Sequence, residues 1–296
     1  MNPLRILAAL LVSVFSLPTL AEVIHREKSL YRNIEVVETA ERRCLIFAVR
    51  QTNHNQSCID LNDPQRIVFP YVRMTLAGLL IQPDIERALI IGLGGGTVPM
   101  TLKTLYPEAM IDSVEIDPAV LRVASDYFGF ASDERNQVAV QDARVFVRRQ
   151  INRGHRYDYI LLDAFTGEYI PEHLMTQEFL KEVKSLLTAD GVLVANTFSS
   201  SRLYDLESVT YAAVFGNLYT MRLPVSGNRI ILATRSGQLP DASRLNQRAQ
   251  SLAPRLAPFG VGLLSFPEYI TDRIDWDTSA TILTDQYSPA NLLNRP

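Results

Sequence analysis

Histidine and cysteine, which supply most transition-metal ligands in proteins, are scarce in this chain of 296 residues. The four histidines are scattered along the sequence without the spacing of a ligand set. Neither of the two cysteines belongs to a Cys-x-x-Cys pair, which argues against zinc and thioredoxin chemistry. The sequence therefore predicts no metal site.

Clusters of positive charge are also lacking. The 29 Lys and Arg residues are spread along the chain and are outnumbered by 32 Asp and Glu, for a net charge of -3. A nucleic-acid-binding protein usually carries a basic patch or stripe, so no nucleic-acid partner is expected. Internal repeats and low-complexity segments are absent. The 47% hydrophobic content is enough for one large or two modest domains with their own cores.

The chain has no apolar run of the roughly 20 residues that a membrane-spanning helix needs. The longest candidate, Ile6 to Leu17, has about a dozen residues, follows Arg5, and precedes a small-x-small pattern ending at Ala21. This pattern is typical of a secretory signal peptide over residues 1–21. It predicts an exported, periplasmic protein whose mature chain starts near Glu22. The alternatives are an uncleaved membrane anchor or a cytoplasmic protein with a misassigned start.

The two cysteines lie in strand-like segments, "RRCLIFAV" and "QSCIDL", on either side of a polar, turn-like stretch. Such a hairpin places Cys44 and Cys58 nearly opposite each other. An oxidising compartment would permit a disulfide between them. Two buried free thiols are the alternative, and the sequence leaves both open.

Three regions follow the leader. Residues 22–63 are strand-like and predict a small antiparallel β domain. Residues 64–237 alternate apolar strands with amphipathic helices, which predicts an α/β domain with a mostly parallel sheet. That sheet ends in an antiparallel hairpin around Gly227-Asn228, as in the class I methyltransferase variant of the Rossmann-like fold. Residues 238–296 predict a helix and a wrapping tail, in which Asp285 is a candidate to cover the site.

The segment "ALIIGLGGGT" runs from a buried strand through Gly92, Gly94, Gly95 and Gly96 into a helix. Glycine permits positive φ and a close approach of the backbone to a ligand. The helix N-terminus that follows offers free N–H groups. The loop therefore suits a nucleoside lying across the strand ends. A tight strand-to-helix turn without a ligand is the structural alternative.

Acidic residues follow the next strands in turn. Glu115, 23 positions after Gly92, can accept the protons of both ribose hydroxyls, whereas Asp117 precedes a proline and is expected to cap a helix. Asp142 is a candidate for the adenine amino group or for another helix cap. Asp163, at the end of the strand "YILL", is expected to contact substrate or act in catalysis, or else to be a turn residue.

NAD is the competing ligand for such an arrangement. Its fingerprint requires a third glycine or alanine where this chain has Thr97, and the expected terminal hairpin leaves no second mononucleotide-binding half. An S-adenosyl sulfonium compound is therefore favoured over NAD.

In order and spacing, "SLYRNIEV", "LIIGLGGGT", "VEIDP", "QDARVFV" and "YDYILLDAF" resemble the spermidine synthase (polyamine aminopropyltransferase) family. The resemblance implies a homodimeric transferase of polyamine biosynthesis that uses decarboxylated S-adenosylmethionine and an amine acceptor. It implies that Glu115 binds ribose, Asp142 binds adenine and Asp163 is the base. Tyr71 and Glu168 are further candidates for substrate contacts.

The chain departs from that family at the amine-binding positions. Gly95 stands where the family's glycine loop has an aspartate, and Thr166 replaces the second acid of its Asp-x-x-Asp pair. Tyr71-Val72-Arg73 replaces a Tyr-His-Glu triplet. The sequence thus indicates a divergent branch. An S-adenosylmethionine-dependent methyltransferase, or an exported binding protein that retains the fold without catalysis, remain the alternatives.

Overall fold

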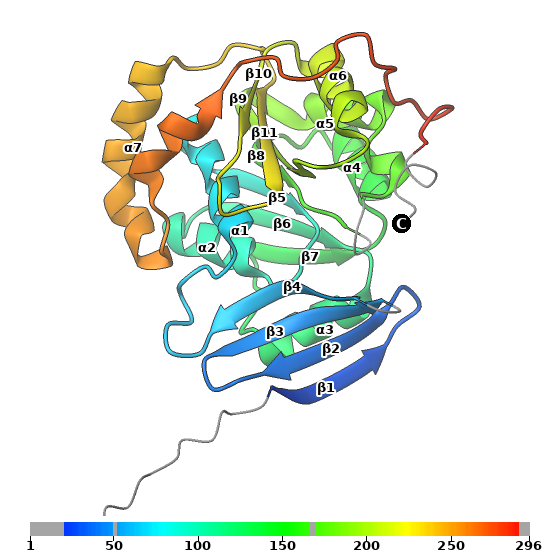
Figure 1. Cartoon of the computed structure of the whole chain (residues 1–296), viewed down its shortest axis with the longest axis vertical. Helices are drawn as coiled ribbons and strands as arrows, with labels where there is room; N and C mark the ends of the chain where they lie inside the picture. The colour runs from blue at the N-terminus through cyan, green and yellow to red at the C-terminus, as the bar shows by residue number, and fades with distance from the viewer. Residues whose placement is uncertain (1–20, 50–51, 166–169, 290–296) are drawn as a thin grey trace, which may run out of the picture.

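Two sheets form the framework of the chain (Figure 1). The computed structural model describes residues 21–49, 52–165 and 170–289, so the predicted leader lies outside the described residues. The first sheet is a four-stranded antiparallel meander in the order β1-β2-β3-β4. Its strands are β1 (Glu22–Lys28), β2 (Asn33–Glu38), β3 (Arg42–Val49) and β4 (Thr52–Asp60).

The second sheet has eight strands in the order β12-β10-β11-β9-β8-β5-β6-β7. Strands β9, β8, β5, β6 and β7 are parallel, whereas β11 pairs antiparallel with β9 and with β10. This confirms the mostly parallel, methyltransferase-like sheet that ends in an antiparallel hairpin. The strands are β5 (Arg87–Ile91), β6 (Met110–Glu115), β7 (Asn136–Val140), β8 (Tyr157–Leu162), β9 (Leu187–Phe198), β10 (Leu218–Met221), β11 (Asn228–Thr234) and β12 (Ile270–Thr271).

Helices cover both faces of this sheet because its strands are apolar on both sides. Ala88 and Ile90 of β5 pack in the core under α1, η1, α2 and α7, while Leu89 and Ile91 face α4, α5 and α6. The helices are α1 (Pro70–Thr75), η1 (Leu76–Leu80), α2 (Thr97–Leu105), α3 (Pro118–Tyr127), α4 (Ala143–Asn152), η2 (Glu172–Leu174), α5 (Gln177–Leu186), α6 (Tyr204–Phe215), α7 (Ala242–Leu256), η3 (Ala257–Phe259) and η4 (Leu263–Tyr269). None of the helices in the described part of the chain is long and apolar enough to cross a membrane.

The small sheet is attached to the large domain through α3. Ile34, Val36 and Leu45 pack against Val120 and Val123 of that helix. This contact holds β4 beside the loop that follows β5, since Ser57 of β4 lies against Gly95. The N-terminal sheet therefore borders the space at the carboxyl end of β5.

Cys44 and Cys58 face each other in the register of β3 and β4, with their Cα atoms 4.1 Å apart. The structure joins them by a disulfide, one of the two alternatives that the sequence left open. The bridge closes a hairpin with a sequence separation of 14 residues. It fixes β4 to β3 one residue away from Ser57.

Candidate active site

A cavity of about 180 Å³ lies at the carboxyl ends of the parallel strands, between the two domains. Drug-sized ligands usually occupy roughly 300–1,000 Å³, so a nucleoside must displace side chains at the rim. Tyr31 and His173, both about half exposed, are the rim groups that can move. The cavity is lined by Tyr31, Arg32, Phe47, Gln56, Tyr71, Ile91, Gly92, Gly94, Val114, Glu115, Ile116, Gln141, Asp142, Ala143, Asp163, Ala164, Phe165, Pro171, His173 and Leu174.

The glycine loop after β5 forms the floor of this cavity. Gly92 has φ +99°, and a Cβ there would come within 2.3 Å of the Asp163 carbonyl oxygen. No other residue fits, so Gly92 lets β5 and β8 end side by side. Gly92 and Gly94 line the cavity, as the nucleoside prediction requires. Gly95 and Gly96 lie behind it, against Ser57 and Phe130, so packing explains these two glycines.

Glu115 ends β6 with its carboxylate tied to the glycine loop. Its Oε2 accepts the Leu93 N–H at 3.1 Å, and its Oε1 accepts the Asp117 N–H at 3.0 Å. Burial raises the pKa of Glu115, and these two hydrogen bonds and the Arg32 charge offset part of that effect. Each carboxylate oxygen keeps a second lone pair, so the group can still accept two hydroxyl protons from a ligand.

Arg32 enters the cavity from the turn between β1 and β2. Its guanidinium lies 4.2 Å from the centre of the Phe47 ring, and Nη1 donates to the Phe165 carbonyl. Its Nε lies 3.7 Å from Asp117 and has no hydrogen-bond partner among the described residues, although it is buried. Sequence reasoning passed over Arg32, although it lies inside the quoted segment "SLYRNIEV" and could have been found there.

Asp117 does not line the cavity. It begins α3, where Oδ1 accepts the Ala119 N–H at 2.9 Å and Oδ2 accepts the Ser29 hydroxyl proton at 2.5 Å. This is the capping role expected for an aspartate before a proline.

Asp142 has one of the two roles that the sequence left open, that of a helix cap, and it also lies in the candidate cavity. It caps α4 by accepting the Val145 N–H at 3.0 Å. Its Oδ2 lies 2.8 Å from His173 Nε2. Partial burial acts to raise the pKa of Asp142, but the hydrogen bonds from Val145 and His173 hold it below its usual value. The structure places His173 in the lining of the cavity, whereas the sequence alone favours a surface loop position for a histidine in the segment "IPEHL".

Asp163 follows β8 directly and faces the same cavity. Burial raises the pKa of Asp163 to about 7, against a hydrogen bond from Asn196 Nδ2 at 2.8 Å that lowers it. A carboxyl with this pKa is about half ionised at neutral pH, and a general base is most effective when its pKa lies near the operating pH. The protein thus brings Glu115, Asp142 and Asp163 into one cavity, as the sequence predicted.

The remaining candidates divide between the site and other places. Tyr71 lines the cavity, where burial and the Asp163 charge raise the pKa of its hydroxyl. Glu168 lies outside the described residues. Asp285 does not cover the site: it forms an ion pair with Arg144 of α4 and accepts the Thr176 hydroxyl proton, which fastens the tail to α4 and α5. The spacing of residues in the sequence does not reveal that Asp285 pairs with Arg144, a buried arginine on α4.

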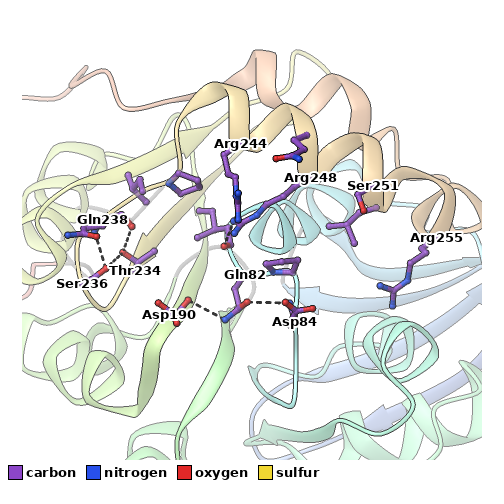
Figure 2. Close-up of a pocket in the computed structure, with 16 residues that line it drawn as sticks. Gln82, Asp84, Asp190, Thr234, Ser236, Gln238, Arg244, Arg248, Ser251 and Arg255 are labelled. Carbon is purple, nitrogen blue, oxygen red and sulfur yellow. Dashed lines mark hydrogen bonds between the residues drawn. The ribbon is translucent and has the colours of Figure 1, made fainter.

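A larger groove of about 840 Å³ lies at the opposite end of the sheet, beneath α7 (Figure 2). Its arginines mostly tie α7 to neighbouring elements. Arg248 donates to the carbonyls of Leu80 and Ile81, and Arg255 donates to the Leu105 carbonyl. The groove has no counterpart of the buried carboxyl that marks the first cavity, so the first cavity is the candidate site.

The groups that line the first cavity suit an adenosyl sulfonium compound. A bare backbone lies at Gly92 and Gly94, Glu115 has lone pairs for a diol, and the buried Arg32 Nε has a proton that no described group accepts. Fold and cavity together define a Rossmann-like protein of the methyltransferase type with a cleft at the carboxyl ends of its parallel strands. A family model described as "Spermine/spermidine synthase domain" matches residues 71–226, more than half of the chain. The chain belongs to the spermine/spermidine synthase family.

One curated relative agrees with this assignment, and two solved structures share the fold. A polyamine aminopropyltransferase of Vibrio vulnificus is 52% identical over 297 residues, 99% of each chain. A crystal structure of a probable spermidine synthase from Corynebacterium glutamicum has a TM-score of 0.64 and 21% identity, over 88% of this chain and 99% of that one. Human methyltransferase-like protein 13, solved with SAH, has a TM-score of 0.58 and 27% identity over 72% of this chain and 98% of its own.

Proposed function

We propose that this protein transfers an aminopropyl group from decarboxylated S-adenosylmethionine to a polyamine acceptor. The observation that carries the proposal is the Asp163 carboxyl, which has a pKa of about 7 and lies beside the nucleoside-binding glycine loop. The 52% identity to a polyamine aminopropyltransferase along the whole chain supports the same activity.

The chemistry assigns a role to each group. The acceptor amine is an ammonium at neutral pH and must lose a proton before it can attack. Asp163 takes that proton. The amine nitrogen then bonds to the propyl carbon next to the sulfonium, the carbon–sulfur bond breaks, and methylthioadenosine leaves. Glu115 accepts hydrogen bonds from the ribose hydroxyls. Asp142 and His173 line the part of the cavity that takes the adenine.

The glycine loop favours methyl transfer from S-adenosylmethionine as the second candidate. Gly95 stands where the family has an aspartate that binds the donor's amine, and Ser57 fills the space beside it. A site without that aspartate discriminates less against a donor that keeps its carboxylate.

The test combines two donors with two variants. Purified protein is incubated with decarboxylated or intact S-adenosylmethionine and a diamine, and mass spectrometry distinguishes aminopropylated from methylated product. Asp163→Asn should lower aminopropyl transfer by about 10²–10⁴-fold, the usual contribution of a positioned base. It should leave the affinity for methylthioadenosine, measured by calorimetry, nearly unchanged.

Glu115→Gln should instead weaken methylthioadenosine binding, because an amide accepts from a diol at one oxygen only. A methylated product would support the second candidate. Binding of neither donor nor methylthioadenosine would favour the remaining alternative, a binding protein that retains the fold without catalysis.

A further inference from the structure

The two strands that flank the site end in register. Leu162 of β8 pairs with Ala195 of β9, so the next residues, Asp163 and Asn196, lie side by side at the strand ends. The Asn196 side chain is only 3% exposed, and its Nδ2 donates to Asp163 Oδ1 at 2.8 Å. Among the described residues, this is the side chain that hydrogen-bonds the carboxyl.

A second asparagine, Asn228, forms a hydrogen bond with the Asn196 side chain. Asn228, the first residue of β11, pairs with Phe198, so it lies diagonally across from Asn196 on the same face of the sheet. Its Nδ2 donates to Asn196 Oδ1 at 2.9 Å. The Ser226 hydroxyl lies 3.1 Å from Asn228 Oδ1 and donates to it. The β10–β11 hairpin thus reaches the active site through side chains.

The donors in this series of hydrogen bonds all point toward Asp163. An ionised carboxylate accepts hydrogen bonds only, so Asn196 must present its NH₂ group to Asp163 and its oxygen to Asn228. Asn228 must in turn present its NH₂ group to Asn196 and its oxygen to Ser226. Every donated proton points toward Asp163. The hydrogen bonds within such a chain polarise one another in a low-dielectric interior.

We propose that Asn196 and Asn228 are positioning residues, which orient the Asp163 carboxylate toward the acceptor amine and favour its ionised form. This inference rests on the proposed role of Asp163 as the base. The antiparallel hairpin therefore takes part in the reaction without touching substrate: it specifies which way the Asn196 amide points.

The other ionisable groups near Asp163 are the same in wild type and variants. Tyr71 from α1 and Tyr159 from β8 interact electrostatically with it, and both have pKa values above the assay range because they are buried. Arg32, Glu115, Asp142 and His173 line the same cavity and are the same in wild type and in every variant.

The experiment measures kcat/KM against pH with decarboxylated S-adenosylmethionine and a diamine, for wild type and three variants. Asn196→Leu removes the donor to Asp163, so the acid limb of the profile should move up by about one pH unit, the effect of one charge-assisted hydrogen bond. Asn228→Leu leaves the Asn196 amide unoriented and should give a smaller shift in the same direction. Asn196→Gln keeps an amide and should restore part of the wild-type profile.

Thr197→Val is the matched control. Thr197 is the next residue of β9 and is also buried, but its hydroxyl contacts Arg229 on the opposite face of the sheet. This variant should be less stable and show an unshifted acid limb. Calorimetric binding of methylthioadenosine confirms that each variant retains a folded donor site.

A lower kcat/KM in Asn196→Leu with an unmoved acid limb would overturn the positioning role, as would an equal shift in Thr197→Val. Full activity in Asp163→Asn would instead contradict the proposed base. The two failures are therefore distinguishable.

Discussion

At the scale of single residues, Asp163 is a carboxyl held between two opposing influences. The surrounding protein removes water and raises its pKa, while the Asn196 amide favours the charged form. The result is a pKa of about 7, compared with an ordinary value of 3.8. A catalytic base with this pKa destabilises the fold when it ionises, so function and stability oppose each other at this position.

This opposition predicts a pH dependence of stability. Because the folded pKa of Asp163 is raised, its stabilising contribution is complete below about pH 4 and is lost as the pH rises through 7. A shift of about three pH units corresponds to a change of about 4 kcal/mol. The free energy of unfolding of Asp163→Asn, relative to wild type, should therefore increase between pH 4 and pH 8 by up to this amount.

Urea denaturation at several pH values measures that difference. Glu207, whose pKa is also raised to about 7 by burial, is present in both proteins and cancels in the comparison. A difference that stays constant with pH would show that Asp163 is not desolvated in the folded protein.

At the scale of elements, β4 and the glycine loop fit against each other. A Cβ on Gly95 would lie 2.6 Å from Ser57 Oγ and 3.0 Å from Ser57 Cβ. The disulfide at Cys58 holds β4 at this distance. Position 95 thus has no room for the family's aspartate, because Ser57 on the strand fixed by the disulfide occupies the adjacent space.

Gly95→Ala should lower the free energy of unfolding by about 1–3 kcal/mol, the usual cost of overpacking. Ser57→Gly removes the two closest atoms and leaves Phe128 Cδ1 at 3.2 Å, so adding Gly95→Ala to that background should cost less. The coupling energy of this double-mutant cycle, from urea denaturation, is the measurement. Additive effects would mean that strand and loop do not press on each other.

At the scale of the whole molecule, the Cys44–Cys58 disulfide and the predicted leader are features of proteins from an oxidising compartment. We propose that the chain is exported to the periplasm, as the predicted leader indicates. We also propose that it acts as a homodimer, as the family resemblance implies. A donor that is made in the cytosol would then have to reach the protein from elsewhere.

N-terminal sequencing of protein recovered from the periplasmic fraction checks this proposal, and a mature chain beginning near Glu22 is expected. Light scattering of the same material should give about twice the mass of one chain. A chain that stays in the cytoplasm and begins at Met1 would refute the export proposal, and a monomer would refute the dimer. Cytoplasmic fractions from the same cells serve as the control.

The sequence alone determined what depends on local order. The alternation of apolar strands and helices predicted the parallel sheet, and each acid after a strand had to reach the same sheet edge, because parallel strands end together. Glu115, Asp142 and Asp163 were found in this way. The hairpin at Gly227-Asn228 was also predicted, but Asn228 was assigned to the turn alone.

Only the tertiary structure decided which distant groups meet. Arg32 comes from a turn of the other sheet. Asn196 contacts Asp163, 33 residues away in the sequence, and Asn228 contacts Asn196, 32 residues away. No local pattern encodes those contacts, since they depend on register and packing. The same holds for Ser57, whose position against Gly95 follows from how the small sheet docks on α3, and for Asp285, which pairs with Arg144 because the tail returns to α4.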